Sequence, residues 1–195
     1  MSIFLIRHGE TEWSLSGRHT GRTDIPLTEQ GERDARALGA RLRDHTFVRV
    51  FTSPLQRARR TCTLAALVPT AEVAPDLAEW DYGEYEGQLS ADIRQARAGW
   101  NLFRDGCPGG EMPAQVSERV DRFIARLRAL DGNVALFSHG HLGRVLAARW
   151  LVLPVTEAQK FLLGTASISI LGSEPSHPEV PVIALWNSSS ESGSP

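Results

Sequence analysis

Short apolar runs rich in β-branched and aromatic residues alternate along this chain with longer segments in which apolar residues have helical spacing. Strands separated by helix-length segments are typical of a largely parallel sheet that is covered by helices on both faces. The pattern therefore predicts an α/β protein, a three-layer α/β/α sandwich with a mostly parallel central sheet. The expected strands are residues 3–6, 48–52, 134–137, 167–171 and 182–186.

Four segments between these strands carry helix signals. Thr28 is a residue type that caps helix N-termini, and acidic residues follow it in the first turn. Ser53-Pro54 places a capping residue before a proline directly after the second strand, which predicts that a helix begins there. Two further helices are expected, one over about residues 114–130 and one from near His141.

The overall charge excludes a general attraction to polyanions. The formal net charge is -2, so neither nucleic acid nor a membrane is an expected partner. The 21 lysine and arginine residues include only one lysine, Lys160. Almost every cation is therefore a guanidinium group, which is always charged and binds phosphate or carboxylate oxygens through paired N–H groups.

The length of 195 residues suits one domain over residues 1–187, and the Ser- and Gly-rich residues 188–195 are expected to form a disordered tail. Two cysteines cannot build a disulfide framework. The apolar run 3–6 ends at Arg7 and is too short for a signal peptide or a membrane span. These features favour a cytoplasmic location.

Conspicuous polar residues follow three of the expected strands at the point where each strand ends. Arg7 and His8 follow the first strand, Arg57 lies one helical turn beyond the second, and His139 closely follows the third. Ligands of open α/β sheets bind at the carboxyl ends of the strands. If these three strands are neighbours, two histidines and two arginines meet in one crevice beside helix N-termini, which favour an anion.

These residue types indicate phosphoryl-transfer chemistry. A neutral imidazole can attack phosphorus when a hydrogen-bond acceptor holds its other ring nitrogen. Neighbouring guanidinium groups disfavour the imidazolium form and stabilise charge on the phosphoryl oxygens. A carboxylic acid can supply the proton that the leaving alkoxide needs. The richest source of carboxylates is residues 77–87, which contain Glu79, Asp81, Glu84 and Glu86.

Five ordered blocks of sequence carry a resemblance to a known family. The first contains Arg7-His8-Gly9-Glu10 and ends near Thr28, and the others are residues 53–61, 79–87, 108–111 and 138–140. In order and spacing they resemble the histidine phosphatase superfamily, the phosphoglycerate mutase-like proteins. The resemblance extends to about residue 150 and implies a phosphoglycerate mutase-like fold.

The resemblance also implies residue roles. The nucleophile of the family falls on His8, its phosphate clamp on Arg7, Arg57 and His139, and its proton donor on Glu79. A phosphoryl group would pass to the histidine, and water would then hydrolyse the phosphoenzyme without a metal or a cofactor. The positions that match further substrate contacts of the family are Ser14, Thr20, Gly21, Tyr82 and Gly140.

Departures from the family pattern favour a phosphatase over a mutase. Cofactor-dependent mutases carry asparagine at the positions of Ser14 and His141, and they have a longer segment with a lysine and an arginine pair where this chain has residues 88–106. A bisphosphorylated cofactor would therefore have fewer groups to hold it. A cofactor-dependent phosphoglycerate mutase remains the alternative function.

The sequence segments around Glu79 and over residues 100–107 are similar to those of small bacterial acid phosphatases and a eukaryotic sedoheptulose bisphosphatase. This similarity implies a phosphoric monoester hydrolase whose substrate is a small phosphorylated metabolite, such as a sugar phosphate. Within the same stretch, Asn101 and Arg104 are candidate pocket residues.

Three further questions stay open at this point. A binding module that keeps the pocket without turnover is a third hypothesis, which the intact set of site residues disfavours. The pair His139 and His141 could suggest a metal, but the two arginines of the clamp would repel a divalent cation, so no metal is expected. We assign no role to His19, and a homodimer through an edge strand or a helix is compatible with this architecture.

Overall fold

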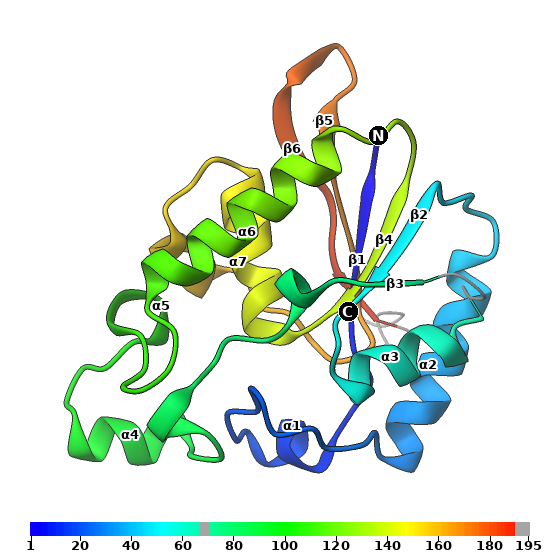
Figure 1. Cartoon of the computed structure of the whole chain (residues 1–195). Helices are drawn as coiled ribbons and strands as arrows, with labels where there is room; N and C mark the ends of the chain where they lie inside the picture. Colours follow the sequence, from blue (N-terminus) through cyan, green and yellow to red (C-terminus); the bar gives the residue numbers. More distant parts are fainter. Residues whose placement is uncertain (67–70, 190–195) are drawn as a thin grey trace, which may run out of the picture.

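The computed structural model describes residues 1–66 and 71–189, and its central element is a mixed β-sheet (Figure 1). The strand order is β3-β2-β4-β1-β5-β6. Strands β3, β2, β4 and β1 run parallel, whereas β5 is antiparallel to both β1 and β6. The strands are β1 (Ile3–Arg7), β2 (Arg49–Thr52), β3 (Glu72–Val73), β4 (Val134–Ser138), β5 (Ile168–Glu174) and β6 (His177–Ser188).

Helices cover both faces of the sheet because successive side chains of a strand point to opposite sides. Ile3 and Leu5 of β1 pack in a buried cluster with α6 (Pro113–Arg128) and α7 (Gly140–Trp150). Phe4 and Ile6 pack in a second cluster with α2 (Glu29–Leu42) and α3 (Gln56–Leu64). Figure 1 shows these helix pairs on opposite sides of the sheet. The predicted three-layer sandwich is confirmed.

The carboxyl ends of β1, β2 and β4 meet at one edge of the sheet because β4 pairs in parallel with both of its neighbours. The short helices α1 (Glu12–Ser16) and α4 (Ser90–Ala96) lie at this end of the molecule (Figure 1). The three strands expected to carry the polar residues are therefore neighbours, and their loops leave the sheet side by side.

Several details of the predicted elements are wrong, and β6 spans His177–Ser188 rather than residues 182–186. The helix after β2 begins at Gln56 rather than at Ser53-Pro54, and its N-cap, Leu55, has no side-chain hydrogen bond. The Ser53 hydroxyl instead accepts the Leu55 N–H at 3.2 Å and bonds the His139 ring at 2.7 Å. The edge strand β3 was not predicted, because two residues are too few to show a strand pattern.

Strand β6 ends at Ser188, one residue into the stretch predicted as a tail. Arg41 donates to the backbone carbonyl and the hydroxyl of Ser188, at 3.0 and 2.8 Å. Residues 190–195 lie outside the described residues, so the rest of the tail stays a prediction. Among the described residues, no helix is both long and apolar enough to cross a membrane.

The loop that follows β1 lies against the first turn of α2 with no room for a side chain between them. A Cβ atom on Gly31 would lie 2.2 Å from the carbonyl oxygen of Glu10, and a Cβ on Gly9 would lie 2.4 Å from the carbonyl oxygen of Gly31. Both neighbours are backbone atoms that cannot rotate away. The two glycines therefore fix the residues next to His8 against a rigid helix.

We expect Gly31→Ala to lower the free energy of unfolding by about 2 kcal/mol, because overpacking against backbone outweighs the gain of about 1 kcal/mol in helix propensity. Urea unfolding followed by circular dichroism measures the change. The control is Gly164→Ala, where a Cβ would lie 3.4 Å from the Asn187 side chain and the change should stay below about 0.5 kcal/mol. A stabilised Gly31→Ala variant would contradict the tight contact.

Candidate active site

His8 is the first residue after β1, and its backbone N–H donates to the Ser138 carbonyl at 3.0 Å. Its Nδ1 lies 2.7 Å from the carbonyl oxygen of Gly9. Because a carbonyl can only accept, Nδ1 carries the proton in this contact and Nε2 holds the free lone pair. The His8 side chain is therefore oriented as a nucleophilic imidazole requires.

Two arginines without acidic partners lie near this imidazole. Arg57 is fully buried and donates to the backbone carbonyls of Thr20, Gly21 and Thr23 at 2.9–3.0 Å. Arg7 donates to the carbonyl of Leu163. Neither guanidinium forms an ion pair with a carboxylate in the described part of the chain, so neutral carbonyl dipoles orient both positive charges without cancelling them.

His139 lies behind His8 and is fully buried. The two ring centroids are 5.2 Å apart, and Nε2 of His139 bonds the Ser53 hydroxyl at 2.7 Å. Within the described residues, the buried side-chain nitrogens that have no hydrogen-bond partner are Nε of Arg7, Nε of Arg57 and Nδ1 of His139. Buried polar atoms are normally paired, so this group of three is unusual. All three belong to the predicted phosphate clamp.

Burial holds both imidazoles in the neutral form. It lowers the pKa of His8 well below the usual range, and the nearby charges of Arg57 and Arg7 lower it further. The pKa of His139 is lowered for the same reasons, burial first and then Arg57. A cation next to a cation is unfavourable in a site from which water is excluded. The nucleophilic form of His8 is therefore its stable form at neutral pH.

Glu79 is 8% exposed and binds the first turn of α7. Its Oε1 accepts the backbone N–H groups of Leu142 and Trp80 at 2.8 and 2.9 Å, and its Oε2 accepts the N–H of His141 at 3.0 Å. Free N–H groups and the helix dipole make this helix end a favourable place for a carboxylate. The contacts fix both oxygens next to the cavity that His8 lines.

The segment that carries Glu79 is supported from behind by the Pro-Gly-Gly-Glu block. The Trp80 indole and the Asp81 N–H donate to the carbonyl and carboxylate of Glu111, each at 2.9 Å. Arg119 holds the same carboxylate with two N–H groups at 2.9 and 2.7 Å. A Cβ on Gly110 would lie 2.3 Å from the carbonyl oxygen of Asp81. This close packing explains why the block contains glycine and a glutamate.

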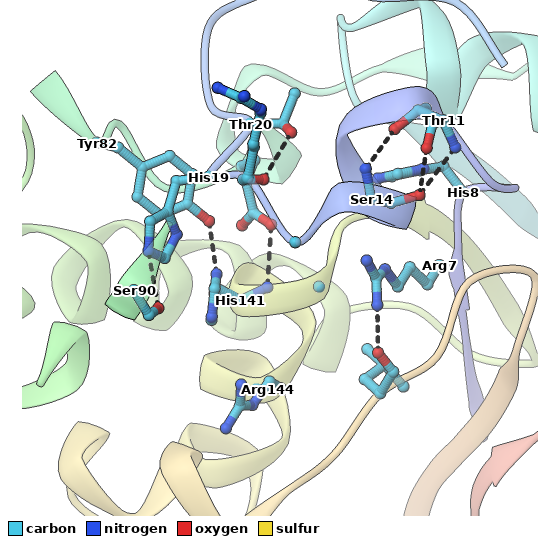
Figure 2. Close-up of a pocket in the computed structure, with 15 residues that line it drawn as sticks. Arg7, His8, Thr11, Ser14, His19, Thr20, Tyr82, Ser90, His141 and Arg144 are labelled. Atoms are coloured by element: carbon cyan, nitrogen blue, oxygen red, sulfur yellow. Dashed lines mark hydrogen bonds between the residues drawn. The ribbon is translucent and has the colours of Figure 1, made fainter. Parts of the chain in front are cut away.

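A cavity of about 290 Å³ opens in front of these residues (Figure 2). It is large enough for a small metabolite rather than a macromolecule. Of the predicted catalytic residues, His8, Arg7 and Glu79 line it, whereas Arg57 and His139 are buried and are not among the lining residues. The lining also includes predicted substrate-binding residues, namely Ser14, Thr20, Tyr82 and Gly140.

Three predicted substrate-binding residues are not part of this lining. The Gly21 N–H is already bonded to the Glu86 carboxylate at 2.8 Å. Asn101 lines a neighbouring hollow, where its amide donates to Gln159. Arg104 is exposed and pairs with the adjacent Asp105 at 2.8 Å, so its charge is neutralised away from the cavity.

The cavity is also lined by residues that were not predicted to belong to the site, among them His19 and Arg144. His19, to which no role was assigned, packs on Tyr82 with ring centroids 4.7 Å apart and bonds the Ser90 hydroxyl at 3.1 Å. Its position inside the first of the five sequence blocks could have indicated that it belongs to the site. Arg144 lines the same cavity. It lies one helical turn after Gly140, which was predicted to contact substrate.

His141 bonds the Tyr82 hydroxyl through its Nδ1 at 2.6 Å, which occupies the ring nitrogen on that side. No group of three or more His, Cys, Asp or Glu side chains that could hold a metal occurs among residues 1–66 and 71–189. The site combines a neutral imidazole with a free lone pair, guanidinium groups without ion-pair partners and an oriented carboxyl group. Chemically, this combination suits transfer of a phosphoryl group to nitrogen and then to water.

The family comparison agrees with the geometry. Residues 3–188 match the family model of the histidine phosphatase superfamily, branch 1. The chain belongs to this superfamily, and the expected enzyme class, a phosphoric monoester hydrolase, is confirmed.

Three relatives illustrate the match. An acid phosphatase of Mycobacterium tuberculosis is 41% identical, over 94% of this chain and 92% of that protein. The sedoheptulose 1,7-bisphosphatase of Saccharomyces cerevisiae is 38% identical, over 77% of this chain and 68% of that protein. The solved structure of a Mycobacterium tuberculosis open reading frame superposes with a TM-score of 0.91 at 39% identity, covering 96% of this chain and 97% of the other.

The buried histidines make stability depend on pH. Burial lowers the pKa values of His8, His139 and His141, and it lowers that of His19 to about 4. Because these values lie below the unfolded value of about 6.5, the unfolded chain binds more protons as the pH falls. The contribution of these neutral histidines to the free energy of unfolding is complete above about pH 6.5, and it is lost as the pH falls toward the pKa of each histidine in the folded protein.

We expect the free energy of unfolding to fall between pH 7.5 and 5, with each such histidine contributing about 1.4 kcal/mol per pH unit below its unfolded pKa. Urea unfolding at several pH values measures this slope. His19→Gln should make it shallower, because glutamine cannot take up a proton. His177→Gln, at an exposed position, is the matched control. Equal slopes for the His19 variant and the wild type would contradict the assignment.

Proposed function

We propose that this chain hydrolyses phosphomonoesters of small metabolites through a phosphohistidine at His8, with Glu79 as the proton donor. The observation that carries the proposal is the neutral His8 imidazole, which is held by the Gly9 carbonyl and flanked by arginines that form no ion pair with a carboxylate of the described residues. A nucleophile and an anion-binding charge in one buried place are what attack on a phosphate ester requires.

In the first step, Nε2 of His8 attacks phosphorus and the bond to the ester oxygen breaks. Arg7, Arg57 and His139 form the phosphate clamp, and the buried nitrogens that they leave unpaired support this role. Positive charge fixed before the reaction stabilises the three equatorial oxygens without a reorganisation cost. Glu79 gives its proton to the departing oxygen, so the alcohol leaves in neutral form.

In the second step, Glu79 takes a proton from water while the water oxygen attacks the phosphohistidine. The nitrogen–phosphorus bond breaks, inorganic phosphate forms and Glu79 is again protonated. Hydrogen bonds from the start of α7 keep the carboxyl group in one position through both steps. The cycle balances without a metal or a cofactor.

The substrate in this proposal is a small phosphorylated metabolite, such as a sugar phosphate, which a cytoplasmic enzyme would meet. The size of the cavity and its polar lining support this class, as does the sugar bisphosphate in the name of the yeast relative. Ser14, Thr20, Tyr82 and the Gly140 backbone are the proposed contacts, while Gly21 acts by placing the carbonyl that orients Arg57.

We expect His8→Asn to lower kcat for p-nitrophenyl phosphate by at least about 1,000-fold, because the phosphoryl acceptor is lost. Wild-type enzyme quenched during turnover with ³²P-labelled substrate should carry an acid-labile, base-stable label that the variant lacks. His45→Asn changes an exposed histidine on another part of the chain and is the matched control. Full activity of His8→Asn would exclude this mechanism, and no activity over a broad panel of phosphate esters would favour a binding module.

Glu79→Gln keeps the shape of the side chain and removes the proton. We expect kcat/KM to fall by about 100-fold or more for a sugar phosphate, whose alkoxide needs a proton, and by a smaller factor for p-nitrophenyl phosphate, whose leaving group does not. Steady-state kinetics with both substrates measures the two ratios. Equal losses would assign Glu79 a structural role instead.

The alternative function has its own test. Interconversion of 3- and 2-phosphoglycerate that depends on a bisphosphoglycerate and exceeds hydrolysis would replace the phosphatase assignment by a mutase. Activity that survives a chelator would argue against a metal in either reaction.

A further inference from the structure

A second hollow adjoins the cavity at the side away from the nucleophile. Its volume is about 280 Å³, and it shares His19, Ser90, His141 and Arg144 with the first cavity. Figure 2 shows Arg144 and His8 on opposite sides of the pocket. The phosphomonoesterase proposed above would leave most of a bound substrate between these two residues.

Arg144 is held in place without an acidic partner. Its Nε donates to the Ala158 carbonyl at 3.1 Å, its Nη2 donates to the Gln159 carbonyl at 2.8 Å, and its guanidinium carbon lies 4.7 Å from the Phe103 ring centroid. Its Nη1 has no hydrogen-bond partner among the described residues, and no described carboxylate forms an ion pair with it. An oriented, uncompensated guanidinium is therefore directed at a hollow rather than at a counter-charge.

Two nearby arginines are paired with a carboxylate, so the unpaired state of Arg144 does not simply follow from the high arginine content of the chain. Arg97 and Arg104 both lie within 4.0 Å of Asp105. Arg94 lines the same hollow as Arg144 and, within the described part of the chain, has no carboxylate partner; its Nε lies 3.4 Å from the Trp100 carbonyl. The positive charges that remain available in the hollow are those of Arg94 and Arg144.

The register of α7 relates the two cationic positions. A Cβ on Gly140 would lie 3.2 Å from the guanidinium carbon of Arg7, and Arg144 follows one turn later on the same face. The backbone positions 140 and 144 are about 6 Å apart along the helix axis. The start of α7 therefore lies against Arg7 of β1, and the next turn of α7 carries Arg144, with His141 between the two positions.

We propose that the hollow around Arg144, here called the Arg144 subsite, binds a second anionic group of the substrate, a phosphate or a carboxylate, while the ester phosphate lies at His8. This proposal rests on the phosphatase function and narrows the substrate to metabolites that carry a second anionic group besides the ester phosphate. An arginine whose guanidinium group is already oriented loses little side-chain entropy when it binds an anionic oxygen. Such an arginine can therefore determine which substrates bind, rather than attract anions in general.

The test compares three probe substrates by kcat/KM: fructose 1,6-bisphosphate, 3-phosphoglycerate and p-nitrophenyl phosphate, which has no second anion. We expect Arg144→Gln to lower the kcat/KM of fructose 1,6-bisphosphate or 3-phosphoglycerate, relative to the kcat/KM of p-nitrophenyl phosphate, by about tenfold or more, the size of one charge-assisted hydrogen bond. A fall for the bisphosphate identifies a phosphate ligand, and a fall for phosphoglycerate identifies a carboxylate ligand.

Arg144→Lys keeps the charge and should retain more of the ratio than Arg144→Gln. Arg128→Gln removes another arginine that lies over an aromatic ring, that of Trp150, and should leave all three kcat/KM values unchanged. If Arg144→Gln does not fold, Arg94→Gln at its exposed position provides the test, with an expected fall of about threefold.

Three results would overturn the inference. Unchanged ratios in both variants would show that the Arg144 subsite contributes no selectivity, and an equal loss for all three substrates would give Arg144 a structural role. Wild-type enzyme that forms a phosphohistidine with p-nitrophenyl phosphate but hydrolyses neither fructose 1,6-bisphosphate nor 3-phosphoglycerate would refute this inference alone. Hydrolysis of none of the three would refute the phosphatase function together with it.

Discussion

The parallel pairing of β4 with β1 and β2 is the constraint on which the rest of the site depends. It places three strand ends at one edge, and backbone hydrogen bonds continue beyond the strands, from His8 to the Ser138 carbonyl and from Ser53 to the Phe137 carbonyl. His139 then becomes the N-cap of α7, whose first N–H groups hold Glu79. The positions of the proposed nucleophile and proton donor therefore both depend on the same central strand.

Burial has two effects that act together at this edge. It removes water from the imidazole of His8 and so favours the neutral form, and it also strengthens the field of Arg7 and Arg57, which disfavours protonation further. A phosphate dianion next to the arginines compensates their charge and so offsets the second effect, whereas the burial of His8 remains. The same burial makes the free protein sensitive to acid, so the stability of the fold and the protonation state of His8 depend on one physical cause.

The sequence predicted the sheet and the residues at its edge because both leave local signals. The apolar runs of β1 and β4 and the polar residues after them are contiguous in the chain, so periodicity and position were sufficient. The family resemblance added Glu79, whose place on the α7 N-terminus depends on contacts with residues more than sixty positions away. No local pattern could have indicated those contacts.

The errors have a physical explanation as well. Ser53 was expected to cap α3 because its local sequence favours a cap, but the buried His139 ring competes for the same hydroxyl. Arg104 was expected in the pocket from its neighbours in sequence, and the adjacent Asp105 neutralises it. Arg144 has no such neighbour, and its significance appears only when α7 is placed beside the cavity. Tertiary contacts decided these outcomes.

The hydrogen-bond partners of each arginine show whether its charge is paired within the protein or remains available to a ligand. Arg119 and Arg149 bind carboxylates with two N–H groups each, so their charge is neutralised within the protein. Arg7, Arg57 and Arg144 are instead held by backbone carbonyls, which orient a guanidinium but leave its net charge uncompensated. Desolvating such a charge is costly unless an anion later replaces the lost water. A fold that keeps three of them around one cavity is therefore organised for an anionic ligand, although its total charge gives no indication of one.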